Sequence, residues 1–502
     1  MSSKKDPLIV IASNRGPFSF EKTDENEVEV KRGAGGLVTA LTALAERHEV
    51  LWVASTMTDG DRYWIEQNEG KAKKVEGINL KLVDPDPKSY EGYYSVISNP
   101  MLWFIQHQLW DIPRKPSVTE ETWNAWEHGY KSVNNLFAEA IAESVKGTDR
   151  PVIVMPQDYH LYMLPHYLRA ELGESAQIQP FIHIPWPGPD AWRILPSQMR
   201  NALLSSLLES NRVGFQTKKD AFNFVQTCRF YLEGAHSHGR RDGIEYRDRD
   251  VAALDFPISI DVEQVQSFVA EDQTQLEKNQ LLNIVGDRSL ILRVDRVEPS
   301  KNNLRGFEAY RTLLENHPEH RGKVQMLALL VPSRMKVGAY TDHLAEVMAE
   351  AGMINAEYSD SFWEPVRIVV GDNYRRALAA MQLYDILLVN PIADGMNLVA
   401  KEGVVVNNKD GVLILSEYAG AFYELGDHAL TVSPFDVYGL AESMHTALSM
   451  QAAERKQRAE SLREIVINAD VKDWFNAQVD EALRSLISQD NKSSTSVKPS
   501  KK

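Results

Sequence analysis

Short apolar runs alternate with amphipathic helical stretches along almost the whole chain, and this alternation limits the folds open to it. Runs such as LIVIAS (8–13), VQMLALLV (324–331) and YDILLVN (384–390) are typical of strands buried on both faces of a parallel sheet. The segments between them, such as residues 303–318, have apolar residues at helical spacing. The alternation predicts an α/β fold with doubly wound parallel sheets.

The strand-like runs fall into two sets, and a chain of 502 residues is long enough for two cores. Pro257 interrupts the pattern between the sets, within LDFPISIDVEQV (254–265). We therefore expect a Rossmann-like N-terminal domain at 1–257 and a Rossmann-like C-terminal domain at 258–487. The last helices of the second domain are candidates for packing back on the first. The polar, low-complexity residues 488–502 are expected to be disordered.

Composition and charge narrow the classes of function. The net charge of −15 argues against a nucleic-acid partner, and the basic segment 238–251 is interleaved with acids, which favours a solvated hairpin. No stretch approaches 18 apolar residues, and no signal-peptide pattern opens the sequence, so we expect no membrane association. The single cysteine, Cys228, fits a reducing, cytoplasmic setting. Assembly into a homo-oligomer is left open.

Cations follow three of the predicted strands. Arg15 comes after the first run, Arg296 and Lys301 follow 289–295, and Arg334 follows 324–331. Arginine binds phosphate oxygens with a planar fork and lysine as a point charge, so Arg296 and Lys301 are candidates to hold a diphosphate. The alternative is surface charge that pairs with Glu298.

The segment PIADGMNLVAKEG (391–403) places an acid and a glycine between a predicted strand and a predicted helix. In open α/β sheets ligands bind at this edge, and the amides of a helix N-terminus favour anions. Asp394 and Gly395 are therefore candidate ligand contacts. The alternative is an ordinary capped loop with Asp394 as the N-cap residue.

Other candidates follow strands in the first half of the chain. Asp158 lies past the run 151–156, and His183 precedes IPWPGP, where prolines fix the backbone. His183 reads equally as a site residue or a structural histidine. The aromatic side chains near them could be core residues or could wall a sugar site; they are Tyr94, Trp103, Trp186 and Trp192.

The sequence lacks the motifs of several common enzyme classes. The sequence contains no CxxC, HExxH, Walker A or GxSxG pattern, and clustered metal-ligand spacing is not evident. The Gly-rich stretch RGAGGL (32–37) is weak as a dinucleotide fingerprint but suits a lid over a phosphate or sugar. No metal and no cofactor are predicted.

Taken in order along residues 8–487, the motifs SNR, GGL, YYSVISNPMLW, QDYHLYMLP, HIPWP, GFQT, RVEPSKN, PSR, DGMNLVAKE and SEYAGA form a recognisable set. In these motifs the sequence resembles the trehalose-6-phosphate synthase family of retaining GT-B glycosyltransferases. The resemblance implies two Rossmann-like domains facing across a cleft. The N-terminal domain would bind the acceptor and the C-terminal domain the nucleotide sugar.

The resemblance also implies roles for residues. Arg296 and Lys301 match the pair that holds the donor diphosphate, and Glu402 matches the acid that accepts the ribose hydroxyls, two helical turns beyond Asp394. The implied donor contacts are Gly36, Arg296, Lys301, Asp394, Gly395, Met396, Asn397, Leu398 and Glu402. The implied acceptor contacts are Arg15, Tyr94, Trp103, Asp158 and Arg334. The residues implied in catalysis are Asp158, His183, Arg296, Lys301 and Asp394.

The activity implied is transfer of glucose from a nucleotide-diphosphate glucose to glucose 6-phosphate with retention, giving trehalose 6-phosphate without a metal. The alternatives are a synthase with another phosphorylated acceptor, as in glucosylglycerol-phosphate synthases or validoxylamine-phosphate-synthase-like pseudoglycosyltransferases, and a non-catalytic sugar-phosphate sensor. The sequence departs from the family pattern at Ser55, Trp186, Ser259 and Asn302. It leaves the nucleotide of the donor open.

Overall fold

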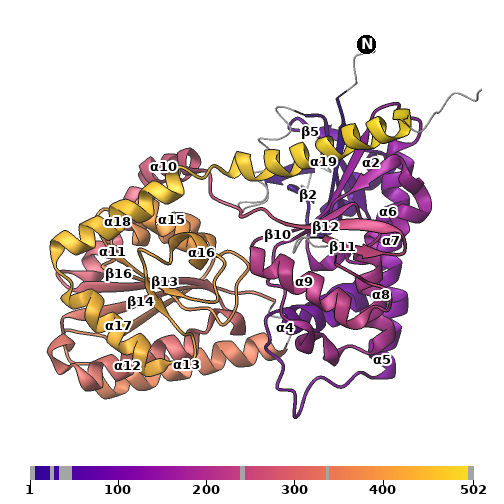
Figure 1. Ribbon diagram of the computed structural model, residues 1–502. Coiled ribbons are helices and arrows are strands. Elements are labelled where there is room, and N and C mark those ends of the chain that lie inside the picture. The colour runs from indigo at the N-terminus through magenta and orange to yellow at the C-terminus, as the bar shows by residue number, and fades with distance from the viewer. Residues whose placement is uncertain (1–5, 23–27, 33–47, 238–242, 335–337, 496–502) are drawn as a thin grey trace, which may run out of the picture. The chain divides into compact units, whose positions relative to one another are not determined.

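A computed structural model describes residues 6–22, 28–32, 48–237, 243–334 and 338–495 (Figure 1). The chain divides into two compact units. The N-terminal unit is Met1–Pro257 together with Lys472–Lys502, and the C-terminal unit is Ile258–Val471. The division falls directly after Pro257, the residue that interrupts the sequence pattern.

Six strands form the main sheet of the N-terminal unit, in the spatial order β5, β6, β4, β1, β7, β8. Neighbouring strands are parallel except β5 and β6. Every residue of β1 and β4 is buried, as continuous apolar runs predict. The strands are β1 (Leu8–Ser13), β4 (Val50–Ser55), β5 (Lys73–Val75), β6 (Ile78–Val83), β7 (Val152–Pro156) and β8 (Ala176–Ile178).

A second sheet of this unit has the order β11, β12, β10, β9, and a bridge between Gln157 and Phe181 connects it to the main sheet. Its strand β9 has only two residues, because Pro180 has no backbone N–H and separates β9 from β8. The strands are β9 (Phe181–Ile182), β10 (Arg212–Phe215), β11 (Gly243–Tyr246) and β12 (Arg249–Asp255).

Two hairpins complete the strands of the N-terminal unit. β11 and β12 are antiparallel and turn through Arg247 and Asp248, both exposed and both at positive φ. This part of the predicted solvated hairpin is present, and residues 238–242 lie outside the described residues. β2 (Phe18–Lys22) and β3 (Val28–Arg32) form a second hairpin, which was absent from the predicted runs.

Helices of the N-terminal unit pack closely at glycines. A Cβ atom on Gly129 would lie 2.7 Å from the backbone nitrogen of Tyr93, so only glycine allows the contact between η1 and η2. The helices are α2 (Asp59–Gln67), α3 (Pro87–Glu91), η1 (Gly92–Leu102), α4 (Trp103–Gln106), α5 (Glu120–Asn124), η2 (Ala125–Lys131), α6 (Ser132–Val145), η3 (Tyr159–Leu161), α7 (Leu164–Leu172), η4 (Gly173–Ser175), η5 (Pro189–Ile194), α8 (Ser197–Leu207), α9 (Lys218–Tyr231) and α19 (Val471–Thr495).

The last helix, α19, belongs to the N-terminal unit although it ends the chain. Its buried Trp474 meets Phe181 of β9 edge-on, with ring centroids 5.0 Å apart. The helix runs to Thr495 and so includes residues 488–495, for which disorder was expected. These residues contain no glycine or proline that would end a helix. Residues 496–502 lie outside the described residues.

All six strands of the C-terminal unit are parallel, in the order β15, β14, β13, β16, β17, β18. This is the predicted doubly wound arrangement: α12, α13 and α17 lie on one face of the sheet, and α11 and α15 lie on the other (Figure 1). The strands are β13 (Ser289–Arg296), β14 (Val324–Val331), β15 (Val366–Val370), β16 (Ile386–Val389), β17 (Val412–Ser416) and β18 (Leu430–Val432).

The core of the C-terminal unit lies between this sheet and the helices α12 and α17. Phe307 and Tyr310 of α12 pack with Leu440 and Met444 of α17 over strand residues such as Ile291, all buried. Full burial stabilises each such side chain by about 1.5–3 kcal/mol. The helices are α10 (Val262–Ala270), α11 (Asp272–Val285), η6 (Pro299–Lys301), α12 (Asn303–Asn316), η7 (Pro318–His320), α13 (Gly338–Tyr358), α14 (Tyr374–Met381), α15 (Leu398–Val406), α16 (Phe422–Leu425), α17 (Val437–Ser449) and α18 (Ala452–Ile467).

Within the described ranges, none of the helices combines the length and the apolar character that crossing a bilayer requires.

Candidate active site

Two predicted substrate-binding arginines come together at the carboxyl edge of the C-terminal sheet. Arg296 ends β13, and Arg334 follows the neighbouring parallel strand β14. Both contact Glu298 Oε1, at 3.1 Å from Arg296 Nη1 and 3.0 Å from Arg334 Nη1. The Arg296 side chain is 48% exposed, whereas that of Arg334 is 9% exposed. Arg296 therefore presents a solvent-facing surface to a ligand.

Glu298 is fully buried, so it is not the surface partner considered as the alternative for these cations. Its Oε1 also accepts a hydrogen bond from Ser333 Oγ at 2.8 Å. Burial alone would raise its pKa, but Arg296, Arg334 and Lys301 outweigh burial and hold the pKa of Glu298 below its usual value. The carboxylate stays ionised and fixes the two guanidinium groups beside each other.

Lys301 and Asp394 form an ion pair, although they lie 93 residues apart in the sequence. Asp394 Oδ2 also accepts a hydrogen bond from Asn397 Nδ2 at 3.0 Å. The buried Arg293 holds the lysine loop from below, because its Nη2 donates to the carbonyl of Lys301 at 3.0 Å. The structure thus brings together the predicted diphosphate lysine and the predicted sugar-binding acid.

The loop before α15 is held by backbone contacts. The amide of Gly420 donates to the carbonyl of Asp394 at 3.0 Å, and that of Ala421 donates to the carbonyl of Met396 at 2.7 Å. A Cβ on Gly420 would lie 1.8 Å from the carbonyl oxygen of Gly395, so this approach requires glycine. The segment from Asp394 to Asn397 is therefore fixed where it leads into the helix.

Asn397, not Asp394, caps α15. Its Oδ1 accepts a hydrogen bond from the amide of Ala400 at 3.1 Å, so the alternative with Asp394 as the cap is wrong. Because α15 begins at Leu398, Asp394 precedes the helix and Glu402 lies within it. The two acids are therefore not two turns apart on one helix, as the spacing implied.

Glu402 accepts a hydrogen bond from the hydroxyl of Tyr374 of α14, with 3.1 Å between Tyr374 Oη and Glu402 Oε1. Burial raises the pKa of Glu402 to about 7, and the bond from Tyr374 offsets only part of the rise. A carboxyl with this pKa changes its charge near neutral pH. Its position on α15 is compatible with the predicted contact to ribose hydroxyls.

Asn302, a departure from the family pattern, follows Lys301 and precedes α12. Its φ of 59° and ψ of 41° lie in the left-handed region, which glycine adopts freely and asparagine tolerates better than most residues. Its Nδ2 donates to the carbonyls of Asn390 at 3.0 Å and Pro434 at 2.7 Å. The departure therefore keeps the backbone shape and adds side-chain hydrogen bonds.

In the N-terminal unit, Asp158 and His183 lie together beyond β7 and β9. Asp158 Oδ1 accepts a hydrogen bond from the backbone amide of His183 at 3.2 Å, and Asp158 itself has a φ of 71°. Positive φ is unusual for aspartate and is often found at functional positions. The two predicted catalytic residues of this unit are thus adjacent.

The His183 ring is held by two glutamines that the sequence did not single out. Its Nε2 lies 3.0 Å from Gln157 Oε1, and its Nδ1 lies 3.4 Å from Gln216 Nε2. The glutamine oxygen can only accept a hydrogen bond and the glutamine nitrogen can only donate one, which selects the neutral ring with the proton on Nε2. Burial lowers the pKa of His183 to about 3, which also favours the neutral ring.

Tyr94 and Arg15 are two of the predicted acceptor residues. Tyr94 is half-buried and stacks on His160 and on Tyr90, with centroid distances of 5.9 and 5.7 Å and rings 8° from parallel in both pairs. Arg15 is exposed after β1. Tyr90 lies just before the motif YYSVISNPMLW and His160 lies beside Asp158 in QDYHLYMLP, but no role was predicted for either.

The three tryptophans named from the sequence, Trp103, Trp186 and Trp192, are buried. Trp186 and Trp192 are 1% and 0% exposed and stack on each other at 4.3 Å, so they do not wall a sugar site. Trp103 is 5% exposed and stacks on His107 at 4.0 Å. Their large apolar surface favours burial over exposure to a ligand.

The remaining positions named from the sequence are Gly36, Ser55 and Ser259. Gly36 and the stretch RGAGGL beyond Arg32 lie outside the described residues. Ser55 and Ser259, two departures from the family pattern, are buried, and their hydroxyl oxygens have no hydrogen-bond partner among the described residues. Nothing in the structure explains why serine occupies these positions.

The sequence model of Glycosyltransferase family 20 matches residues 7–484. The alpha,alpha-trehalose-phosphate synthase [UDP-forming] of Botryotinia fuckeliana is 31% identical over 488 residues, which cover 96% of this chain and 90% of that relative. A bifunctional trehalose-6-phosphate synthase/phosphatase of Thermoproteus tenax is 32% identical over 482 residues, which cover 93% of this chain but 62% of that relative.

Solved structures give the same result. An E. coli trehalose-6-phosphate structure described as bound with UDP-2-fluoro glucose has a TM-score of 0.82 and 27% identity, and the match covers 95% of this chain and 98% of that one. An alpha,alpha-trehalose 6-phosphate synthase from Burkholderia multivorans has a TM-score of 0.82 and 27% identity over 99% of both chains. The predicted GT-B class is confirmed.

Two Rossmann-like units, one of them with cations and a helix N-terminus at the carboxyl edge of its sheet, define a sugar-transferring enzyme of the GT-B class. The chain belongs to glycosyltransferase family 20, whose model spans almost its whole length.

Proposed function

We propose that this enzyme transfers glucose from UDP-glucose to glucose 6-phosphate with retention of configuration and releases trehalose 6-phosphate and UDP. The names of the relatives support the choice of UDP, which the sequence left open. The observation from the structure that supports the proposal most directly is the Lys301–Asp394 pair at the entrance to α15, beside Arg296.

The donor half of the proposal rests on the C-terminal unit. UDP gains negative charge as it leaves, and preorganised positive groups stabilise such charge. Arg296, Lys301 and the N-terminal amides of α15 supply them at one sheet edge. In this proposal Asp394 exchanges part of its contact with Lys301 for donor hydroxyls, and Glu402 accepts the ribose hydroxyls.

The acceptor half rests on Arg15, Tyr94 and Asp158 in the N-terminal unit and on Arg334. Arg15 would bind the acceptor phosphate, and Asp158 would accept a hydrogen bond from an acceptor hydroxyl. A neutral His183 can donate from Nε2 only by giving up its bond to Gln157 Oε1. We therefore assign His183 to positioning the transferred glucose rather than to proton transfer.

The residues support a same-face displacement, in which the acceptor hydroxyl forms the new bond to the anomeric carbon on the side from which the UDP oxygen departs, so that configuration is retained. The departing phosphate would take the hydroxyl proton, because a histidine with a pKa of about 3 is a weak base. No metal enters this scheme: the charges that balance the diphosphate are side chains of this chain. The single, buried Cys228 supports a cytoplasmic location.

A matrix of donors and acceptors tests the function. Purified protein is incubated with UDP-, GDP- or ADP-glucose and with glucose 6-phosphate or glycerol 3-phosphate, and products are identified by mass spectrometry and NMR. We expect an α,α-1,1-linked disaccharide phosphate from UDP-glucose and glucose 6-phosphate. A product formed only with glycerol 3-phosphate would show that glucose 6-phosphate is not the acceptor. Donor binding without any product would show that the protein is a sugar-phosphate sensor and not an enzyme.

A further inference from the structure

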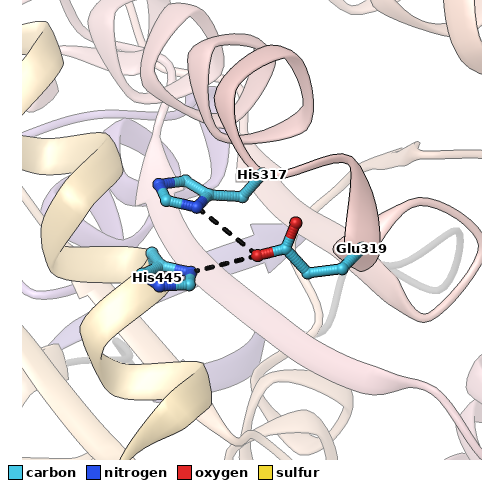
Figure 2. A group of neighbouring side chains, drawn as sticks. All are labelled: His317, Glu319 and His445. Carbon is cyan, nitrogen blue, oxygen red and sulfur yellow. Dashed lines mark ion pairs between the residues drawn. The ribbon is translucent and has the colours of Figure 1, made fainter.

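Three histidines and two glutamates gather on the C-terminal unit where α12 ends beside α17. Figure 2 shows His317, Glu319 and His445 directed toward one another, and one ligand atom from each lies within 4.8 Å of the others. Glu319 Oε1 is 3.5 Å from His317 Nδ1 and 4.0 Å from His445 Nδ1. The two imidazole rings stack 3.7 Å apart.

Two further side chains complete this group, which we call the histidine cluster: His317, Glu319, His320, Glu442 and His445. His320 Nε2 lies 3.0 Å from His445 Nδ1, and Glu442 Oε1 lies 3.0 Å from His317 Nε2. Glu442 therefore binds the ring nitrogen of His317 that faces away from Glu319. A carboxylate in this place fixes the ring and raises the basicity of the other nitrogen, as it does behind metal-bound histidines.

The geometry is close to that of a tetrahedral zinc site. Bonds of about 2.0–2.2 Å from zinc to imidazole nitrogen and carboxylate oxygen put neighbouring ligand atoms about 3.3–3.5 Å apart. The observed separations of 3.5 and 4.0 Å between Glu319 and the two histidines are close to these values, and the stacked rings, 9° from parallel, must rotate for both to point at one ion. The mixture of imidazole and carboxylate ligands suits zinc and its first-row neighbours rather than calcium or magnesium.

The surroundings also favour a cation. His317 is the residue that ends α12, and the carboxyl end of a helix carries a partial negative charge. The side chains of His317 and His445 are 19% and 29% exposed, and that of Glu319 is 54% exposed, so an ion can reach them from solvent.

We propose that His317, Glu319 and His445 bind a divalent transition-metal ion of the zinc type, with water as the fourth ligand and Glu442 as the carboxylate that orients His317. The ion ties the loop before β14 to α17. It takes no part in glucosyl transfer: α12 has 14 residues and begins next to Asn302, so its two ends are about 21 Å apart. The site is therefore structural.

Metal binding is measured on full-length, tag-free protein that has been stripped with a chelator. Calorimetric titration with Zn²⁺ should show one saturable site per chain, and Co²⁺ should give the visible absorption of a tetrahedral complex. The thermal midpoint of the stripped protein should rise with Zn²⁺ concentration, because an ion that binds only the folded chain stabilises it.

Variants assign the site to these residues. His317→Ala and Glu319→Gln should each weaken Zn²⁺ binding at least about 100-fold, and Glu442→Gln should weaken it about 10–100-fold, as loss of an outer carboxylate does. The exposed His128 of the N-terminal unit is the matched control, and His128→Ala should bind as the parent does. Because Glu319 is exposed, we expect Glu319→Gln to fold. It therefore still tests the site if His317→Ala does not fold.

The parent protein and the variants should transfer glucose equally well with and without Zn²⁺. The outcome of the zinc experiment is therefore independent of the outcome of the activity experiment. The proposal is overturned if the stripped parent binds no Zn²⁺ saturably. It is also overturned if Glu319→Gln and the His128 control bind equally, or if zinc does not raise the thermal midpoint.

Discussion

At the scale of single residues, the chemistry depends on acids that the structure places against cations. Glu298 is buried between Arg296 and Arg334, and Asp394 is paired with Lys301. Each acid neutralises a cation while no phosphate is bound. A phosphate that arrives must compete with these contacts, so the cations are preorganised rather than free.

Replacement of Arg296 should affect the donor first. Arg296→Ala removes a charge-assisted contact to the diphosphate, and because this arginine is half exposed we expect a loss of about 1.5 kcal/mol, or about tenfold in UDP affinity. Calorimetric titration with UDP measures the loss. Arg311→Ala, on α12 and paired with Glu357 of α13, is the matched control. Unchanged UDP affinity in Arg296→Ala would disprove the diphosphate assignment.

Glu402 should make donor binding depend on pH. Because burial raises its pKa to about 7, the group is largely protonated below that value and accepts ribose hydroxyls best above it. We expect the affinity for UDP to rise between about pH 6 and pH 8, and Glu402→Gln to flatten the rise. A slope that survives in Glu402→Gln would assign the dependence to another group, such as the UDP phosphate.

The raised pKa of Glu402 also makes the free energy of unfolding depend on pH. The folded chain keeps a proton on Glu402 up to about pH 7, whereas the unfolded chain loses it in the ordinary range of a carboxyl. The folded state therefore binds more protons across this window, and the contribution of Glu402 to the free energy of unfolding falls as pH rises through it.

At the scale of elements, the loops after parallel strands decide the site. The loop from β13 to α12 contains Arg296, Glu298 and Lys301 and ends at Asn302 in left-handed conformation. The loop from β16 to α15 contains Asp394, and the amide of Ile392 donates to the carbonyl of Ser300 at 2.8 Å. Two separate loops thus form one rigid edge of the sheet.

Asn302 should be replaceable by glycine at lower cost than by alanine. Asn302→Ala loses the hydrogen bonds to Asn390 and Pro434 and places a Cβ without compensation at positive φ, which should lower the free energy of unfolding by about 2–3 kcal/mol. Asn302→Gly loses the same bonds but tolerates the conformation, so its loss should be about 1 kcal/mol smaller. Urea unfolding of both variants measures the difference. Equal losses would show that the backbone conformation costs nothing here.

At the scale of the whole molecule, a chain with a net charge of −15 binds two anionic substrates in the proposed reaction. Overall charge repels such ligands, so a few local cations must supply the attraction. Arg15 lies in the N-terminal unit, whereas Arg296 and Lys301 lie in the C-terminal unit. Arg15 can therefore be replaced without touching the donor cations, whereas Arg334 shares Glu298 with Arg296.

Arg15→Ala should raise the KM for glucose 6-phosphate about tenfold or more and leave UDP affinity unchanged, since a single charge-assisted contact to phosphate contributes about 1.5–3 kcal/mol. Steady-state kinetics with each substrate varied, together with UDP titration, measures both effects. Arg229→Ala, an exposed arginine on α9, is the control. If Arg15→Ala changed only the affinity for UDP, Arg15 would belong to the donor site and not to the acceptor site.

Much of this architecture was predictable. Strands such as 8–13 and 324–331 were predicted to the residue, because continuous apolar runs and their turn signals are local properties of the chain. The residues at the strand ends were predicted for the same reason, since parallel strands bring their carboxyl ends to one edge. The β2–β3 hairpin was missed, because its residues are mostly polar and exposed.

The sequence by itself determined the fold class, the order of the strands in the chain and the family. The alternation of apolar runs with amphipathic segments and the order of the motifs can be read without knowing which residues are in contact. Only the tertiary structure decided that Glu298 is buried, that Trp474 packs beside His183, and that His320 meets His445 from 125 residues away. These facts depend on which distant segments pack together. Burial and long-range proximity are properties of the folded whole, and they set the charge state and the neighbours of every group proposed to act.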